Sequence, residues 1–271
     1  VLGRDKLRLQ RQFEGLDAVS WSELSASLLG EMDVVINLVG ENIGNGRWSH
    51  QKKAKIISSR VDATKTIASF CAELKDRSPR LFNASAIGIY GACPQGERDE
   101  ADKVTQNASD FLVDVGRQWE ETLSPAINAG VNVCVLRLGV VLSSKGGMVK
   151  KLMPSVKCGL GAVIGSGNQM ISWVSIVDVV RSIEFLLTKP ELSGPFNIVS
   201  DGVVSQRELM KSLAAYYRRP CFMRMPSAAV SLLFGEMGDC LLLASSIIRS
   251  NRLKEAGFVY NVRSIEQAWG Q

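Results

Sequence analysis

The sequence predicts a doubly wound α/β fold, in which helices cover both faces of a parallel sheet. Short apolar runs rich in β-branched residues alternate with helical patterns over the first two-thirds of the chain. Parallel strands joined by crossover helices produce this alternation. With 271 residues, of which 46% are hydrophobic, the chain can form one large domain or a core domain with a smaller lobe.

Five segments define the predicted sheet and its helices. In chain order they are a strand over 33–40, a polar helix over 48–74, a strand over 80–85, a helix over 111–129 and a strand over 131–142. Each strand is almost continuously apolar, which is typical of strands that are buried on both faces. The order of these segments therefore indicates a parallel sheet.

The pattern changes after residue 142 and predicts a smaller, mostly helical C-terminal lobe. The glycine-rich stretch 158–169 does not match G-x-G-x-x-G, so we expect it to be a flexible loop that lines a pocket. A strand over 195–200 and a helix over 205–217 follow. Ser205 and Glu208 form a capping-box pattern where that helix begins.

The composition argues against nucleic-acid, membrane and metal partners. The formal charge is +5, but the basic residues are dispersed, and we expect the densest cluster, Lys52, Lys53 and Lys55, to be a solvated helix face. No apolar run approaches the ~20 residues that cross a bilayer and no signal peptide opens the chain, so we expect a cytoplasmic protein. Six cysteines without a CxxC pair and one histidine, His50, predict free thiols and no metal site.

Candidate ligand-binding residues lie where strands end, because ligands of an open α/β sheet bind outside the carboxyl ends of its strands. Gly40 follows an apolar strand, where a missing side chain would let a nucleotide approach the backbone, although a glycine at a strand end is often purely structural. Arg4 would pair with the 2′-phosphate of NADP, whereas the adjacent Asp5 would hold the ribose 2′-hydroxyl of NAD. An arginine near a chain end is also commonly just exposed.

Ser85, in the stretch LFNASAIGIYG, is either a catalytic hydroxyl or a small residue that ends a buried strand. The pattern excludes a serine hydrolase, because Ser85 lacks the flanking glycines of G-x-S-x-G and His50 lies in a polar segment. The acidic run over 97–102 lies in a loop that contains proline and glycine, so we expect its charges to be solvated.

Several motifs in register resemble one family. DVVINLVGENIGNGRW, NASAIGIYG, VCVLRLGVVLSSKGGMVKKLMP, GLGAVIGSGNQMISWVSIVDVVR and GPFNIVS occur in the order and spacing of the extended and atypical short-chain dehydrogenase/reductases. The closest resemblance is to the subgroup of epimerase-family proteins (NAD-dependent epimerase/dehydratase-like), and it covers nearly the whole chain.

The resemblance implies a Rossmann domain that binds NADP over 1–157 and a substrate-side lobe over 158–271, interleaved with the last sheet strands. Ser85 falls where the family has its catalytic Ser or Thr. The implied cofactor residues are Gly3 and Arg4, which favour NADP; Leu38, Val39 and Gly40, beside the adenosine and diphosphate; Arg60, from the following helix; and Leu138 and Gly139, on the nicotinamide side.

The chain departs from the family pattern in three places. The family opens with a central strand and a glycine-rich turn, so we expect roughly 30 residues of that kind ahead of Val1 in the native protein. The Tyr-x-x-x-Lys pair is replaced by Leu112 and Gly116. A family His and one Asp are replaced by Ser175 and Val177.

Two functional hypotheses remain open. The first is an NADP-binding oxidoreductase or epimerase-like enzyme that acts on an unknown carbonyl or sugar-nucleotide-like molecule, with Tyr90 as the phenol nearest to Ser85 in the sequence. Packing beside Gly91 in a turn is an equally good reading of Tyr90. The second hypothesis is a non-catalytic NADP-binding regulatory or interaction protein, for example in cell division. Either would be a monomer or a homodimer.

Overall fold

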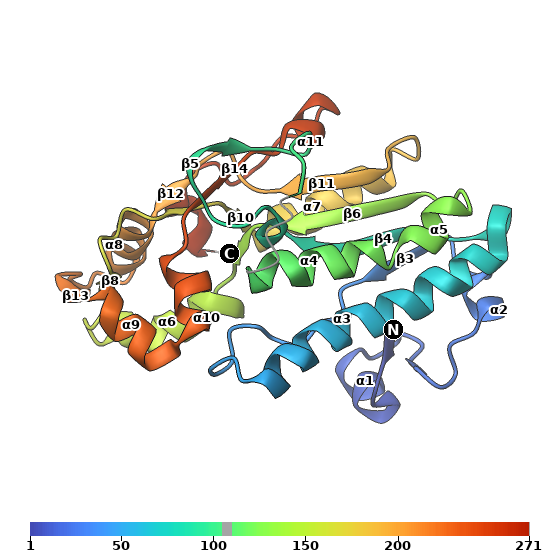
Figure 1. Ribbon diagram of the computed structural model, residues 1–271, viewed down its shortest axis with the longest axis horizontal. Helices are drawn as coiled ribbons and strands as arrows, with labels where there is room; N and C mark the ends of the chain where they lie inside the picture. Colours follow the sequence, from blue (N-terminus) through green and yellow to red (C-terminus); the bar gives the residue numbers. More distant parts are fainter. Residues whose placement is uncertain (105–109, 271) are drawn as a thin grey trace.

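The computed structural model describes residues 1–104 and 110–270. Its centre is a four-stranded sheet with the order β11–β6–β4–β3 (Figure 1). The strands are β3 (Val34–Asn37), β4 (Arg80–Ala86), β6 (Val133–Leu138) and β11 (Gly194–Ile198), and every neighbouring pair is parallel. The predicted doubly wound parallel sheet is confirmed.

Helices cover both faces of this sheet. On one face Leu81 and Val133 pack against Ile67 and Ala126, which belong to α3 (His50–Leu74) and α5 (Ser124–Asn128). On the other face Phe82 packs with residues of α7 (Ile176–Leu187) and α11 (Asn251–Glu255). Neighbouring residues of β4 thus face opposite layers, which explains why the strand is apolar throughout.

Two predicted segments are divided in the structure. The helix predicted over 111–129 is α4 (Phe111–Glu121) followed by α5, with Pro125 in the first turn of α5, where a missing N–H is tolerated. The strand predicted over 131–142 changes partner at Gly139. Before it, β6 pairs with β11; after it, β7 (Val140–Leu142) pairs with β10 (Trp173–Ser175).

Gly139 has no room for a side chain at this change of partner. A Cβ there would lie 2.7 Å from Val199 Cγ1 and 2.9 Å from the Ser172 carbonyl oxygen. The absence of a side chain therefore lets the two neighbouring strands approach the chain as it passes from one to the other.

The lobe has its own core and more strand than the sequence predicts. The glycine-rich stretch contains β8 (Ala162–Ile164), which pairs with β13 (Met223–Met225), so the prediction of a flexible loop is wrong there. The capping box of Ser205 and Glu208 is confirmed at the start of α8. The helix α6 (Gly147–Lys157) comes before the lobe and packs into its core through Val149 and Val156. The other elements of the lobe are β9 (Met170–Ile171), β12 (Val204–Ser205), α8 (Gln206–Tyr216), α9 (Ser227–Phe234), α10 (Glu236–Gly238), the π-helical η3 (Asp239–Leu243), β14 (Ser246–Ile248) and η4 (Ile265–Gly270).

The first thirty residues carry a two-stranded sheet of their own, and Leu29 packs into the core beside Ile67 of α3. In this sheet β1 (Leu2–Gly3) pairs in parallel with β2 (Val19–Ser20), and α1 (Lys6–Gln12) and α2 (Ala26–Leu29) follow these strands. The family strand expected ahead of Val1 stays a prediction. Within 1–104 and 110–270, no helix combines the length and the apolar character needed to span a bilayer.

Candidate functional site

The carboxyl ends of β3, β4 and β6 form an edge with several apolar side chains. Leu38 is 62% exposed and Ala86 is exposed, whereas Leu138 packs partly against the core. The Val39 N–H donates to Asn37 Oδ1 at 3.2 Å, and Asn37 Nδ2 donates to Asn83 Oδ1 at 2.6 Å. Buried amides therefore fix the backbone where β3 ends.

Arg60 lies directly over Gly40. A Cβ at Gly40 would lie 2.9 Å from Arg60 Cζ, so the glycine lets the guanidinium approach the backbone. Arg60 Nη1 donates to the carbonyl oxygens of Glu41 at 3.1 Å and Ile56 at 3.0 Å, and its guanidinium carbon lies 5.0 Å from the Trp119 ring centroid. Burial lowers the pKa of Arg60, and the Glu41 carboxylate opposes that shift.

Arg4 lines a cavity of about 480 Å³ beside β1, together with Asp5, Arg8, Leu9 and Gln12. Asp5 is the N-cap of α1, since its Oδ1 accepts from the Arg8 N–H at 3.0 Å. Arg8 was not among the predicted site residues, although a second arginine four positions after Arg4 was a usable signal.

Gly3 lies beside the same helix α1. A Cβ at Gly3 would lie 2.9 Å from Leu9 Cδ1, so the glycine allows the helix to approach β1.

Ser85 is 3% exposed, and its hydroxyl donates to Glu120 Oε1 at 2.6 Å. The register of β4 and β6 places Ser85 opposite Arg137, which donates to the same carboxylate from Nε at 2.9 Å and from Nη2 at 2.7 Å. Arg137 is 5% exposed. Burial opposes its charge, but the hydrogen bonds and charge of Glu120 raise its pKa overall.

Tyr90 joins the same network from η2 (Ile87–Tyr90). Its hydroxyl accepts from Arg137 Nη1 at 2.7 Å and donates to Asn197 Oδ1 at 3.0 Å. Burial raises the pKa of Tyr90, although the Arg137 charge opposes the shift. Ser85 and Tyr90 are thus linked through Glu120 and Arg137. Glu120, Arg137 and Asn197 were not among the site residues predicted from the sequence.

Leu112 and Gly116, which replace the family Tyr and Lys, pack α4 against η2. A Cβ at Gly116 would lie 2.8 Å from Ile89 Cβ, and Leu112 Cβ would lie 3.3 Å from a Cβ at Gly88. Helix α4 therefore packs tightly against η2, and a lysine at 116 would require η2 to shift.

The polar residues of the segment WVSIVD have structural partners. Ser175 caps α7, its Oγ accepting from the Asp178 N–H at 3.0 Å. Asp178 is fully buried and accepts from the N–H groups of Asn261 and Val262, each at 2.9 Å. This carboxylate therefore attaches the C-terminal segment to the start of α7.

Two groups of charges that the sequence predicts to be solvated have partners instead. Lys52 Nζ lies 2.7 Å from Glu41 Oε1, and Lys53 pairs with Glu236 of α10, so the solvated-face prediction is wrong for both lysines. In the acidic run, Glu100 accepts from the backbone N–H groups of Asn197 and Asn251.

Glu97 in the same run accepts from Arg249 Nε at 2.8 Å. These carboxylates hold β5 (Cys93–Arg98) and the residues after it against β14 and α11. The expectation of a solvated acidic run is wrong for Glu100, whereas Glu97 pairs with Arg249 and stays exposed.

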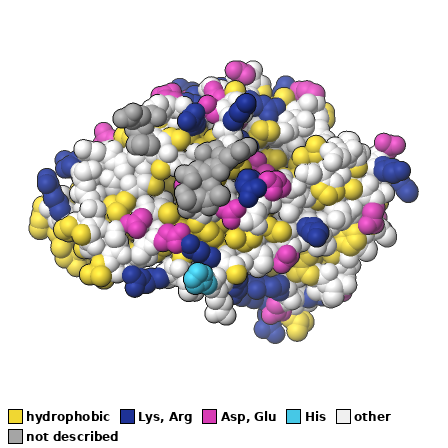
Figure 2. Space-filling view, viewed as in Figure 1, with side chains coloured by type: hydrophobic (Ala, Val, Ile, Leu, Met, Phe, Trp, Pro, Cys, Tyr) yellow, Lys and Arg dark blue, Asp and Glu magenta, His cyan; other side chains and the backbone are white. Residues whose placement is uncertain are grey.

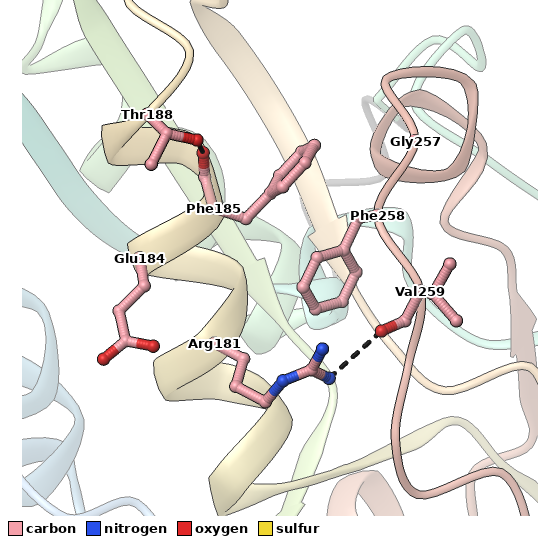
Figure 3. A pocket seen from close by; sticks show the side chains of 7 residues that line it. All are labelled: Arg181, Glu184, Phe185, Thr188, Gly257, Phe258 and Val259. Atoms are coloured by element: carbon pink, nitrogen blue, oxygen red, sulfur yellow. Dashed lines mark hydrogen bonds between the residues drawn. The ribbon is translucent and has the colours of Figure 1, made fainter.

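A second cavity, of about 430 Å³, lies between α7 and the loop after α11 (Figure 3). Phe185 and Phe258 have ring centroids 5.4 Å apart, and Arg181 Nη1 donates to the Val259 carbonyl at 3.0 Å. None of the sequence-predicted site residues lines this cavity.

The family model described as "NAD dependent epimerase/dehydratase family" matches residues 2–199, and a domain of unknown function, DUF1731, matches 225–270. An epimerase family protein of Mycobacterium bovis is 36% identical over 92% of this chain and 81% of its own length. The chloroplastic SDR39U1 homolog of Arabidopsis thaliana is 31% identical over 99% of this chain and 77% of its own length.

Among solved structures, human epimerase family protein SDR39U1 (isoform 2), crystallised with NADPH, matches with a TM-score of 0.85. It is 26% identical, and the match covers 98% of this chain and 88% of that chain. MoeE5 in complex with UDP-glucuronic acid and NAD matches with a TM-score of 0.73 at 19% identity, over 93% of this chain and 85% of its own.

Proposed function

Because the chain belongs to the NAD-dependent epimerase/dehydratase family, we propose that it is an NADP-dependent oxidoreductase or epimerase-like enzyme. Its substrate would be a carbonyl or sugar-nucleotide-like small molecule. The site would lie at the carboxyl edge of the sheet, between the ends of β3, β4 and β6 and the lobe, where ligands of this fold bind.

The observation that carries the choice of NADP is the cavity beside β1. Arg4 and Arg8 both line it, and the one carboxylate that lines it, that of Asp5, already accepts a hydrogen bond from the first turn of α1. Two guanidinium groups suit a 2′-phosphate better than a ribose diol. The likeness to a human protein crystallised with NADPH supports the same choice.

Ser85 and Tyr90 are the proposed catalytic residues. The cofactor, when bound, would supply the hydride. Ser85 would orient the carbonyl oxygen of the substrate, exchanging the hydrogen bond that it now donates to Glu120. Arg137 would hold the Glu120 carboxylate in place and keep Tyr90 from an even higher pKa, so that its phenol can supply a proton.

Cofactor choice is tested by titrating the protein with NADPH and with NADH by calorimetry. In Arg4→Ala/Arg8→Ala, NADPH affinity should fall by about tenfold or more, since charge-assisted hydrogen bonds are lost, and NADH affinity should stay unchanged. Arg11→Ala, on the same helix but outside the cavity, is the matched control. Equal losses for both cofactors would contradict a 2′-phosphate site.

The reaction is tested by following NADPH oxidation with chemically diverse carbonyl compounds and sugar nucleotides. Ser85→Ala and Tyr90→Phe should each lower kcat while NADPH affinity is retained. Unchanged turnover would remove these residues from the mechanism. Tight NADPH binding with no turnover on any compound would favour the non-catalytic regulatory function instead.

A further inference from the structure

Two segments of the chain, which include several elements of the lobe, carry charge of one sign only. Residues 122–177 and 209–235 contain no Asp or Glu, yet both contain several Lys and Arg. They supply α6, β8, most of α8, β13 and α9. Since the whole chain has a formal charge of only +5, the rest of the molecule is net negative and the positive charge is concentrated in these segments.

The most exposed part of these segments is a small region that we name the tip. It consists of Lys157, Leu160, Arg218, Arg219 and residues 222–224. Pairing of β13 with β8 brings the last of these residues beside the strand that follows Leu160, with Met223 opposite Ala162 and Arg224 opposite Val163.

Two further contacts join the parts of the tip. A Cβ at Gly159 would lie 3.9 Å from the Pro220 ring, and Lys157 Nζ lies 5.0 Å from the Tyr217 ring centroid. Figure 1 shows β13 at one end of the longest axis of the molecule, far from α1. The tip thus lies at one end of the molecule and is not part of the sheet edge that carries the proposed site.

Large apolar side chains at the tip face solvent. Phe222 is 76% exposed, Leu160 56% and Met223 40%, and the following helix α9 adds Leu232 at 75%. Single exposed apolar residues are ordinary, but a group of them marks an interaction surface. In Figure 2 apolar and basic side chains gather together at the left end of the molecule, where Figure 1 draws β13 and α9.

The cations of the tip are available to a partner. Lys157, Arg218, Arg219 and Arg224 are exposed, and in the described part of the chain none of them forms an ion pair. Arginines and a lysine around exposed Phe, Leu and Met would attract an anionic surface and place apolar groups in it.

We propose that the tip docks onto a membrane surface containing anionic lipids. The arginines would contact lipid headgroups while Phe222, Met223 and Leu160 enter the boundary of the acyl region. An exposed end that carries both cations and large apolar side chains fits a flat anionic bilayer, which favours a membrane over a partner that needs a groove. The sequence-based expectation of no membrane partner considered only spanning segments, and peripheral docking requires none.

The test is co-sedimentation of the protein with large vesicles of phosphatidylcholine alone and of phosphatidylcholine mixed with phosphatidylserine. Binding should require phosphatidylserine and should weaken as salt rises. Arg218→Glu/Arg219→Glu/Arg224→Glu and Phe222→Ser/Met223→Ser should each weaken it by at least about tenfold. Matched controls are Arg11→Glu/Lys65→Glu/Arg77→Glu for charge and Ile127→Ser/Leu187→Ser for exposed apolar groups, which lie on other elements.

Thermal unfolding and NADPH affinity of every variant show whether it is folded, and neither should change in the tip variants. A polarity-sensitive dye on the exposed Cys158, next to Lys157, should shift to the blue with phosphatidylserine vesicles only. Equal binding to both vesicle types, or equal losses in the control variants, would overturn the proposal. So would tip variants that alter only self-association or only binding of an acidic peptide, since the surface would then belong to a protein partner.

Discussion

At Gly116, one hydrogen atom in place of a methyl group allows α4 to pack against η2. We expect Gly116→Ala to lower the free energy of unfolding by about 1–3 kcal/mol, because its Cβ would lie 2.8 Å from Ile89 Cβ. Urea unfolding measures the change. Gly44→Ala is the control, since no atom lies within 3.6 Å of its added Cβ. Equal unfolding midpoints for the two variants would show that η2 can shift without a loss of stability.

The ion pair of Glu120 and Arg137 is the second residue-scale feature with a measurable consequence. Glu120→Leu leaves the charge of Arg137 buried and unpaired, so we expect a loss of about 3–5 kcal/mol in the free energy of unfolding. Glu121→Leu, next to it but exposed, should cost about 0.5 kcal/mol or less. The double variant Glu120→Leu/Arg137→Leu should regain much of the loss.

The sequence could place Ser85 at a strand end but could not show what its hydroxyl binds. That partner, Glu120, lies 35 residues away on α4, and the packing of α4 against η2 determines the contact. Arg137, a charge within an apolar strand, was a signal that the strand pattern alone left unexplained.

At the scale of elements, Glu100 connects β5 with β11 and α11. Its two carboxylate oxygens accept from the N–H groups of Asn197 at 2.9 Å and Asn251 at 3.1 Å. We expect Glu100→Gln to cost about 1–3 kcal/mol, because both N–H groups lose their charged acceptor. Hydrogen exchange should accelerate at both amides, whereas Glu255→Gln, exposed on α11, should leave both rates unchanged.

The elements predicted best are those whose burial is uniform along their length. β4 and α8 are confirmed because a continuous apolar run and a capping box are local signals. The prediction failed at 131–142, since the division at Gly139 follows from strands that come after residue 172. It failed at 158–169 for the same reason, because β8 exists only through its pairing with β13.

For the whole molecule, alkaline pH should lower the free energy of unfolding through ionisation of Cys240, which lies in the contact between η3 and the helices α3 and α4. Burial, with the carboxylates of Asp110, Glu236 and Asp239, raises the pKa of this thiol from 9.0 to about 11. The Cys240 thiol of the unfolded chain then loses its proton first as pH rises, so the contribution of Cys240 to stability is constant below about pH 9 and falls between about 9 and 11.

Unfolding midpoints measured across this range should fall less steeply in Cys240→Ser than in the wild type. Cys158→Ser, at an exposed thiol, should keep the wild-type slope. If the midpoint of Cys240→Ser falls with pH as steeply as that of the wild type, the loss of stability at alkaline pH belongs to other groups. Tyr90, whose pKa burial raises from 10.0, contributes to the fall in all three proteins.

The change of strand partner at Gly139 has a consequence for anyone who recombines this chain with its relatives. β6 and β7 are consecutive in the chain, yet β6 is paired within the sheet, whereas the three residues of β7, Val140–Leu142, are paired with β10. A chimera joined anywhere between 139 and 172 would therefore take one strand of a pair from each parent. The exchangeable unit begins before Val133, and a crossover placed upstream of that residue takes both the β6–β11 and the β7–β10 ladder from a single parent.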